Sequence, residues 1–286
     1  MKIVVCIKQV GFVYYPAAVD LATGEIDLGK IVFMLNPYDE VAVEEAISIR
    51  EQVANSEVVI ITAGGPETEK ALRYAFAMGA DRMIRINYVS ADSWSTSLAL
   101  SVAIEKNGYD MVFCGKKAID SNGNQMGSFI AERLQIPQVS GIVSMDLAVS
   151  ERKVIVERYL GKGDREEVEC DLPALFTVEM ALNDPRYPTL PKRFAAEKKV
   201  VEIIDPKALG ISPEQEVSLT EIRKISLPRP KTRKVFTPDS SLSAADRIKQ
   251  MMSGGAKSRE AGDVLEGTPE ELAGHIVKFL VQEKVV

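Results

Sequence analysis

The sequence has few of the residues on which common catalytic and metal sites depend. It holds one histidine in 286 residues, and this residue, His275, stands alone near the C-terminus. No CxxC spacing joins the cysteines, and each of Cys6, Cys114 and Cys170 lies in apolar or alternating sequence. A zinc site, a disulfide framework and histidine-based catalysis are therefore not indicated. The cysteines are expected to be small core residues in a reducing cytoplasm.

Long apolar runs, a leader segment and an excess of positive charge are also missing. No run approaches the length of a bilayer span, and strand-like sequence begins at the first residues. The net charge of −6 argues against a nucleic-acid binder that works through a basic surface. We therefore expect a cytoplasmic protein that binds no nucleic acid and is not itself a membrane protein.

Short apolar runs alternate with amphipathic segments over the first half of the chain. Strands are predicted at 2–10, 57–65, 82–88 and 110–116, and helices at 36–52, 66–80, 93–108 and 124–135. Apolar strands that alternate with helices imply a parallel sheet covered on both faces. The predicted fold class is α/β, with a doubly wound, mostly parallel sheet of the flavodoxin-like kind that binds adenine nucleotides.

From residue 138 the pattern changes to shorter, more alternating segments. Strands are predicted at 139–149, 153–160, 165–171 and 174–180, and the turn LGKGD indicates hairpins that extend the sheet antiparallel. Beyond 180, prolines interrupt the chain until a helix begins at Thr268, where Glu271 completes a capping box. We predict an α/β nucleotide-binding domain over 1–185. A partner-recognition loop, a proline-rich linker and a C-terminal helical arm follow over 186–286.

The loop GKKAIDSNGNQMG, at 115–127, joins a buried strand to a helix through small and amide side chains. It offers turn geometry, tolerance of positive φ and a helix cap, and so can present backbone N–H groups to an anion. An ordinary strand-to-helix connection would need similar residues. In an open parallel sheet the loop lies beside 6–8, 36–39 and 63–66. No Walker lysine motif and no GxGxxG occurs, so the residues indicate a bound nucleotide without machinery to hydrolyse it.

Taken together, these residues resemble the beta subunit of electron transfer flavoprotein. The matching stretches are MKIVVCIKQV, LNPYDEVAVEEA, AMGADR, GKKAIDSNGNQMG and NDPRYPTLP, in order from residue 1 to about 195. The resemblance implies a heterodimer with an alpha subunit that binds redox-active FAD at the interface. Such a heterodimer carries electrons from dehydrogenases, such as acyl-CoA dehydrogenases, or from NADH, to a downstream acceptor. Oxidation of NADH is expected only in complex with the alpha subunit.

The resemblance also implies which residues form the nucleotide pocket of the beta subunit. Asp120, Asn124 and Gln125 are the main candidates, with phosphate expected at the N–H groups of 124–126 where the helix begins. Tyr38 is expected to reach the edge of the alpha-subunit flavin, or else to pack against Val41 or Ala42. The remaining candidates are Cys6, Asn36, Pro37, Asp39, Gly64, Gly115, Lys116, Ala118, Ile119, Gly123 and Met126.

Members of that family hold either AMP or a second FAD in this pocket. A second FAD serves electron bifurcation, in which the electrons of NADH are divided between two acceptors. The segment SADSWSTS favours a second FAD, because hydroxyls and free N–H groups there can bind a pyrophosphate or ribityl chain. Helix capping explains the same serines, and Asn124 resembles the AMP-type loop. We expect a second FAD, with AMP as the alternative. Its predicted contacts are Asp92, Ser93, Ser95, Thr96 and Ser97.

Two further segments are expected to bind partners. The resemblance implies that Leu190, in a stretch that prolines keep extended, anchors the chain in a pocket of the partner dehydrogenase. Tyr187, Pro191 and Phe194 would support this anchor. The alternative is a buried staple between body and tail.

The C-terminal helix carries an apolar stripe with helical spacing, which must be buried against another surface. The stripe comprises Leu272, Ile276, Phe279 and Leu280. We expect it to pack on the alpha subunit, although packing on the chain's own sheet is simpler. The competing function is a stand-alone nucleotide-binding sensor that self-associates.

Overall fold

A computed structural model of the chain describes residues 1–13, 20, 25–90, 92–211, 218–221, 223, 241–252 and 267–282. They divide into two compact units, Met1–Pro228 and Arg229–Val286. The first unit carries the sheet, and the second carries helices α7 (Ala244–Met252) and α8 (Pro269–Gln282). The predicted domain boundary at 185 differs from this division. Residues 186–209 belong to the first unit because they bond to its helices and extend its sheet.

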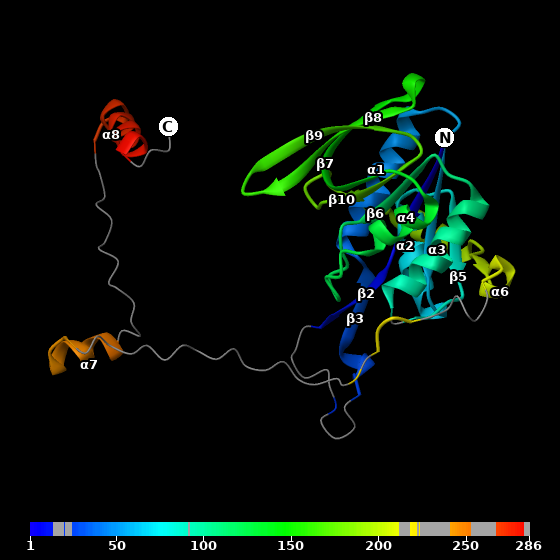
Figure 1. Ribbon diagram of the computed structural model, residues 1–286, viewed down its shortest axis with the longest axis horizontal. Helices are drawn as coiled ribbons and strands as arrows, with labels where there is room; N and C mark the ends of the chain where they lie inside the picture. Colours follow the sequence, from blue (N-terminus) through cyan, green and yellow to red (C-terminus); the bar gives the residue numbers. More distant parts are fainter. Residues whose placement is uncertain are drawn as a thin grey trace. The chain divides into compact units, whose positions relative to one another are not determined.

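A nine-stranded sheet forms the centre of the first unit (Figure 1). The strands lie in the order β11, β5, β4, β1, β6, β10, β7, β8, β9. Those from β11 to β7 are parallel, and β8 and β9 extend the sheet antiparallel. This confirms the predicted α/β fold class. The strand bounds are β1 Lys2–Cys6, β4 Glu57–Ala63, β5 Arg82–Ile86, β6 Met111–Gly115, β7 Gln138–Ala148, β8 Lys153–Gly161, β9 Asp164–Asp171, β10 Ala174–Val178 and β11 Glu202–Ile204.

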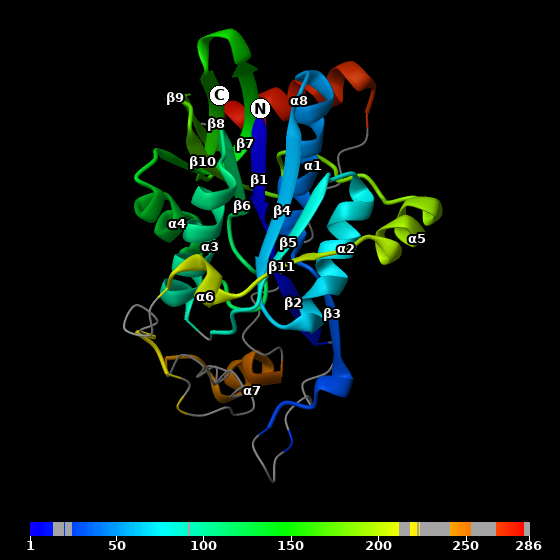
Figure 2. The same cartoon turned by 90° about the vertical axis from the view of Figure 1, so that its right-hand side faces the viewer.

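Helices cover the parallel part of the sheet on both faces (Figure 2). Helices α1 and α2 contribute to one core cluster, and α3 and α4 contribute to the other. Successive residues of β1 alternate between these clusters: Ile3 and Val5 belong to the first, Val4 and Cys6 to the second. A strand buried on both faces needs an unbroken apolar run, which is what the sequence contains. The helix bounds are α1 Pro37–Gln52, α2 Glu69–Met78, α3 Ser93–Asn107 and α4 Met126–Leu134, with short 3₁₀ turns at Leu28–Lys30, Pro66–Thr68 and Val149–Glu151.

Strand β10 corrects the predicted strand pairing. The sequence predicts that 174–180 extends the sheet antiparallel, but β10 runs parallel between β6 and β7. All five of its residues are buried, as expected for a strand inside the sheet rather than near its edge. The β8–β9 hairpin is as predicted, and its turn holds Lys162 and Gly163 at positive φ.

The first predicted strand, 2–10, is wrong beyond Cys6. Two side chains bond to the backbone where β1 ends: the Thr62 hydroxyl donates to the Ile7 carbonyl (2.8 Å), and Asp39 accepts from the Lys8 N–H (2.7 Å). The chain then enters a separate two-stranded antiparallel sheet. This sheet consists of β2 (Gln9–Val13) and β3 (Ile31–Leu35).

The sequence does not predict the elements after residue 180 in the first unit. They are α5 (Leu190–Lys198), the edge strand β11 and α6 (Pro206–Leu209). The capping box of α8 is as predicted, because the Thr268 N–H donates to Glu271 (2.9 Å) and the Glu271 N–H donates to the Thr268 hydroxyl (3.4 Å). Among the described residues, no helix combines the length and the apolar character that a membrane span requires.

Candidate functional site

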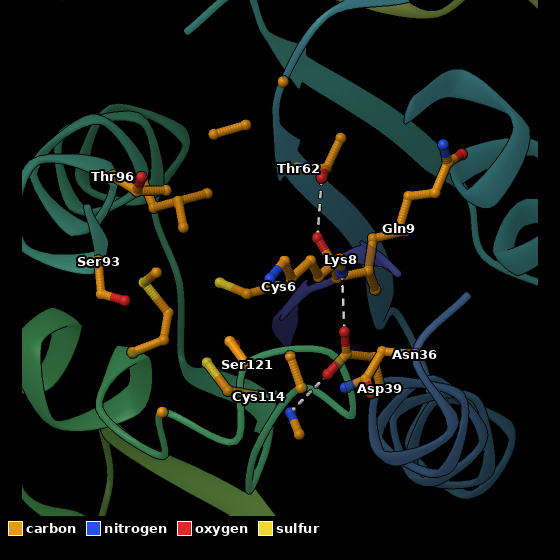
Figure 3. Close-up of a pocket in the computed structure, with 18 of the residues that line it drawn as sticks. Cys6, Lys8, Gln9, Asn36, Asp39, Thr62, Ser93, Thr96, Cys114 and Ser121 are labelled. Carbon is orange, nitrogen blue, oxygen red and sulfur yellow. Dashed lines mark hydrogen bonds between the residues drawn. The ribbon is translucent and has the colours of Figure 1, made fainter. Parts of the chain in front are cut away.

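A cavity of about 350 Å³ lies where the strand order of the sheet reverses (Figure 3). Within this sheet, the next strand after β1 is β4, which lies on one side of it. The next strand after β6 is β7, which lies on the other side. The carboxyl ends of β1 and β6 therefore flank a crevice, and ligands bind in such crevices of open parallel sheets. The walls come from these strand ends, the first turn of α3 and the loop before α4.

Asp39, on the first turn of α1, joins the two strands at this point. One of its carboxylate oxygens accepts from the Lys8 N–H (2.7 Å) and the other from the Gly115 N–H (3.0 Å), so both are engaged within the chain. Burial raises the pKa of Asp39 from 3.8 to about 7, although these hydrogen bonds oppose the shift. Asp39 thus lines the cavity and also fastens the ends of β1 and β6 together.

Asn36 fastens the loop 115–125 to the start of α1. Its amide donates to the Lys117 carbonyl (2.9 Å), and its carbonyl oxygen accepts from the Ile119 N–H (3.2 Å). The residue is buried and precedes the helix, but its side chain makes no capping bond. Asn36 therefore shapes the cavity through the loop.

The loop before α4 has the backbone that its sequence predicts. Asn122 and Asn124 both adopt positive φ, a conformation that asparagine tolerates better than most residues. Helix α4 begins at Met126, and Gln125 at its N-cap makes no side-chain capping bond. Because Asn124, Gln125 and Met126 line the cavity, it reaches the positive end of a nine-residue helix.

Asp120, one of the main predicted contacts, lies outside the cavity lining. Its carboxylate pairs with the Lys8 ammonium (2.8 Å). Lys8 itself lines the cavity, as do Lys116 and Lys117. The other two lysines also have partners: Lys116 forms an ion pair with Glu179. The Lys117 ammonium makes a cation–π contact, 5.7 Å from the centre of the Tyr38 ring. Two of the three lysines are therefore paired with carboxylates, and Lys117 contacts an aromatic ring instead.

At the serine-rich start of α3, some polar side chains line the cavity and others are buried within the fold. Asp92 caps the helix by accepting from the Trp94 N–H (2.9 Å), and this hydrogen bond lowers the pKa of Asp92. Ser95 donates to the Asp92 carbonyl (3.2 Å) and Ser97 to the Trp94 carbonyl (2.7 Å), and both are buried outside the lining. Asp92 lines the cavity together with Ser93 and Thr96.

Cys6 and Cys114 form a pair in the cavity wall. They are register partners on the adjacent strands β1 and β6, and both are buried and free. The pKa of the Cys114 thiol is raised well above its ordinary value, first by the hydrogen bond with Cys6 and then by burial. Both cysteines, like the buried Cys170, are the reduced core residues that the sequence predicts. Neutral thiols of this kind make a soft, weakly polar surface.

Most of the predicted pocket residues do converge on the cavity. Those that line it are Cys6, Asn36, Asp39, Gly64, Asp92, Ser93, Thr96, Gly115, Lys116, Ala118, Gly123, Asn124, Gln125 and Met126. Those outside the lining are Pro37, Tyr38, Ser95, Ser97, Ile119 and Asp120. Sequence reasoning missed Gln9, Thr62, Thr68, Tyr88 and Leu100, among others. Thr62 could have been inferred from its strand end, whereas Leu100 has the pattern of an ordinary core residue.

The predicted docking residues lie on α5 or, in the case of Tyr187, just before it, and all are apart from the cavity lining. Tyr187, Leu190 and Phe194 are 88%, 64% and 62% exposed. Leu190 begins a helix with Thr189 at the N-cap and Pro191 in the first turn, so the predicted extended stretch is wrong. Proline in the first turn favours helix initiation because its φ is already helical. Leu190 is also too exposed to be the alternative, a buried staple.

Helix α8 of the second unit carries the predicted apolar stripe. Ile276 and Phe279 are 60% and 61% exposed, while Leu272 is half-buried. The side chain of Leu280 lies outside the described residues.

Comparison with known proteins gives one consistent result. Residues 29–209 match the family described as "Electron transfer flavoprotein domain". The chain is 42% identical over 208 residues to "Electron transfer flavoprotein subunit beta" of Thermoanaerobacterium thermosaccharolyticum, covering 71% of this chain and 78% of the relative. It is 32% identical over 274 residues to the protein of the same name from Bacillus subtilis, covering 93% of both. It is 35% identical over 218 residues to "Caffeyl-CoA reductase-Etf complex subunit CarD" of Acetobacterium woodii, covering 75% of this chain and 82% of that protein.

Proposed function

The chain belongs to the electron transfer flavoprotein family as a beta subunit, and from this premise we propose that it forms a heterodimer with a flavin-binding alpha subunit. In this heterodimer the chain is an electron carrier that receives electrons from a dehydrogenase, such as an acyl-CoA dehydrogenase, and passes them to a downstream acceptor. FAD at the interface with the alpha subunit carries the electrons. The observation that carries the proposal is the match over 29–209, a range that spans most of the cavity wall.

Exposed apolar side chains on α8 support a chain that another protein covers. The second unit exposes Ile276, Val277 and Phe279 on α8 by about three fifths each. Apolar side chains gathered at this exposure on one helix favour a surface that another protein covers. We propose that the flavin-bearing part of the alpha subunit covers α8.

Co-expression with and without a candidate alpha subunit tests the heterodimer. The expected result is a yellow one-to-one complex on size-exclusion chromatography, with the absorption bands of bound flavin. The chain without its partner is expected to aggregate or remain unstable. A colourless, stable homodimer that does not bind the alpha subunit contradicts the proposal and favours the self-associating sensor.

For the cavity, we propose an adenine mononucleotide such as AMP as a structural ligand. Its phosphate would meet the N–H groups at the start of α4 and the positive charge of Lys117, which contacts the Tyr38 ring rather than a carboxylate. The volume of about 350 Å³ is near the lower end of the roughly 300–1,000 Å³ typical of small-molecule pockets. Ser95 and Ser97, expected from the sequence to contact a second FAD, are buried outside the cavity lining. Both observations favour the smaller nucleotide.

A second FAD remains the competing ligand. Its support is that Asp92, Ser93 and Thr96 do line the cavity at the start of α3. With a second FAD, the heterodimer would take electrons from NADH and divide them between two acceptors, as electron bifurcation requires.

Docking to the dehydrogenase is proposed for the α5 surface, defined as Tyr187, Leu190 and Phe194. Leu190 and Phe194 are exposed apolar side chains of a helix that also carries Lys192 and Arg193, and the exposed Tyr187 lies just before this helix. An apolar centre beside cationic side chains suits a partner pocket that is apolar and bordered by acidic residues. Leu190 is the proposed anchor, and Pro191 keeps it at the helix start.

A further inference from the structure

Helix α5 is short and makes few apolar contacts with the body of the protein. It has nine residues, and within it Ala196 is the buried side chain. Isolated helices of this length are marginal in water, because the cost of nucleation exceeds what so few residues return. Contacts with other elements must therefore hold α5 in position, and two arginines make them.

Arg186 fastens the segment that leads into α5. Its backbone N–H donates to Glu44 of α1 (3.0 Å), and its guanidinium donates to the same carboxylate through Nε (2.9 Å) and Nη2 (2.8 Å). The guanidinium also pairs through Nη1 with Glu51, which lies two turns further along α1 (2.6 Å). Glu44 is buried, so this is a charge-assisted, bidentate contact that is sheltered from solvent.

Arg73 of α2 fastens the other end of α5. Its Nη1 donates to three carbonyls at the helix C-terminus: Ala196 (2.6 Å), Glu197 (3.1 Å) and Lys199 (2.9 Å). The last carbonyls of a helix lack partners within it and carry its negative dipole end. A guanidinium at this position satisfies them and is attracted by the dipole.

We infer that Arg186 and Arg73 are positioning residues, which hold α5 at both ends so that the α5 surface is rigid before a partner arrives. The two arginines act through Leu190 and its neighbours rather than by touching the dehydrogenase. A surface that is already ordered loses less conformational entropy on binding. This inference rests on the proposed docking function and adds how the docking surface is organised.

The substitutions Arg186→Lys and Arg73→Lys test the inference. Each keeps the positive charge but loses the planar fork that reaches several acceptors at once. Arg50→Lys is the matched control, because Arg50 also bonds to a carbonyl, that of Gly79 (2.8 Å), and to a carboxylate, that of Asp81 (2.7 Å). All variants are made in the full chain and purified as the heterodimer with the alpha subunit.

Two measurements are compared: amide hydrogen exchange over 190–199, and steady-state reduction of the heterodimer by a purified acyl-CoA dehydrogenase. We expect both test variants to speed exchange in α5 by about tenfold and to raise KM for the heterodimer by about fivefold at unchanged kcat. The control is expected to change neither quantity. Unchanged exchange, or faster exchange without a rise in KM, overturns the positioning role.

Leu190→Ala, measured in the same assay, separates this inference from the docking proposal. If Leu190→Ala raises KM while the arginine variants do not, the α5 surface is the docking site and the arginines are not its positioning residues. If Leu190→Ala leaves KM unchanged, docking at α5 is wrong, and the inference that rests on it falls with it.

Discussion

The cavity and the α5 surface are built in opposite ways. Backbone groups and short side chains at the ends of buried strands form the cavity, so its shape follows from the strand order. Exposed apolar side chains form the α5 surface, on a short helix held by Arg186 and Arg73 from outside. The proposed ligand site is thus a product of the core, whereas the proposed docking surface depends on a few long-range bonds. Changes at the first should affect stability, and changes at the second should affect partner binding.

The largest expected effect comes from removing the exposed C-terminal helix. Deletion of residues 258–286 removes α8 with Ile276 and Phe279, while the cavity in the first unit keeps all its residues. We expect no heterodimer on size-exclusion chromatography after co-expression with the alpha subunit. A heterodimer that still forms, with only a lower melting temperature, would mean that α8 stabilises its own chain instead.

At the cavity, Asp39→Asn should strongly destabilise the fold. The amide has one acceptor oxygen for the two N–H groups of Lys8 and Gly115, so one buried N–H loses its partner. We expect a loss of about 2–4 kcal/mol in the free energy of unfolding at pH 5, measured by urea titration. Asp120→Asn is the control, because its exposed pair with Lys8 contributes only about 0–1 kcal/mol. Equal losses in the two variants would contradict the role given to Asp39.

Asp39 also predicts how stability depends on pH. Because burial raises its pKa from 3.8 to about 7, the folded state binds more protons than the unfolded state between these values. The contribution of this group is therefore fully present below about pH 4 and is lost as the pH rises through 7. From pH 5 to pH 8 the wild type should lose about 2–3 kcal/mol relative to Asp39→Asn. Parallel pH profiles for the two proteins would contradict the raised pKa.

At the docking surface, Leu190→Ala should change partner binding and leave stability nearly unchanged. Leu190 is 64% exposed, so its truncation removes little from the core. An anchor residue of an interface is worth about 2 kcal/mol, which corresponds to a rise in KM of about thirtyfold with the dehydrogenase. Leu160→Ala, at a leucine that is 55% exposed on the β8–β9 hairpin, is the control. A lower melting temperature with an unchanged KM would reverse the assignment.

The sequence predicts the fold well where periodicity and burial agree. Continuous apolar runs identify β1, β4 and β6, because strands covered by helices on both faces need such runs. It fails at β10, since pairing direction depends on which strands lie beside it and not on its own residues. It also misses α5, because that helix is held by Arg73 and by the bond of Arg186 to Glu44, and both bonds join residues far apart in the sequence.

The sequence predicts the candidate site at the level of segments and less well at the level of side chains. Strand ends and the loop 115–127 are identified because the sheet topology gathers them at one edge. Ser95 and Ser97 cannot be distinguished from Ser93 and Thr96 by residue type, although only the latter two line the cavity. Asp120 has the chemistry of a ligand contact, but Lys8 pairs with it. Such choices depend on rotation about a helix and on neighbours that no local pattern contains.

The most direct test of the account is the nucleotide content of the purified heterodimer. Flavin is quantified by absorption after denaturation, and released adenine nucleotide is quantified by chromatography on the same sample. We expect one FAD and one AMP per heterodimer, because the cavity at the ends of β1 and β6 is small and the Ser95 and Ser97 hydroxyls of α3 donate to carbonyls at the start of their own helix. Two FAD and no AMP would contradict the proposed mononucleotide site and favour a bifurcating complex.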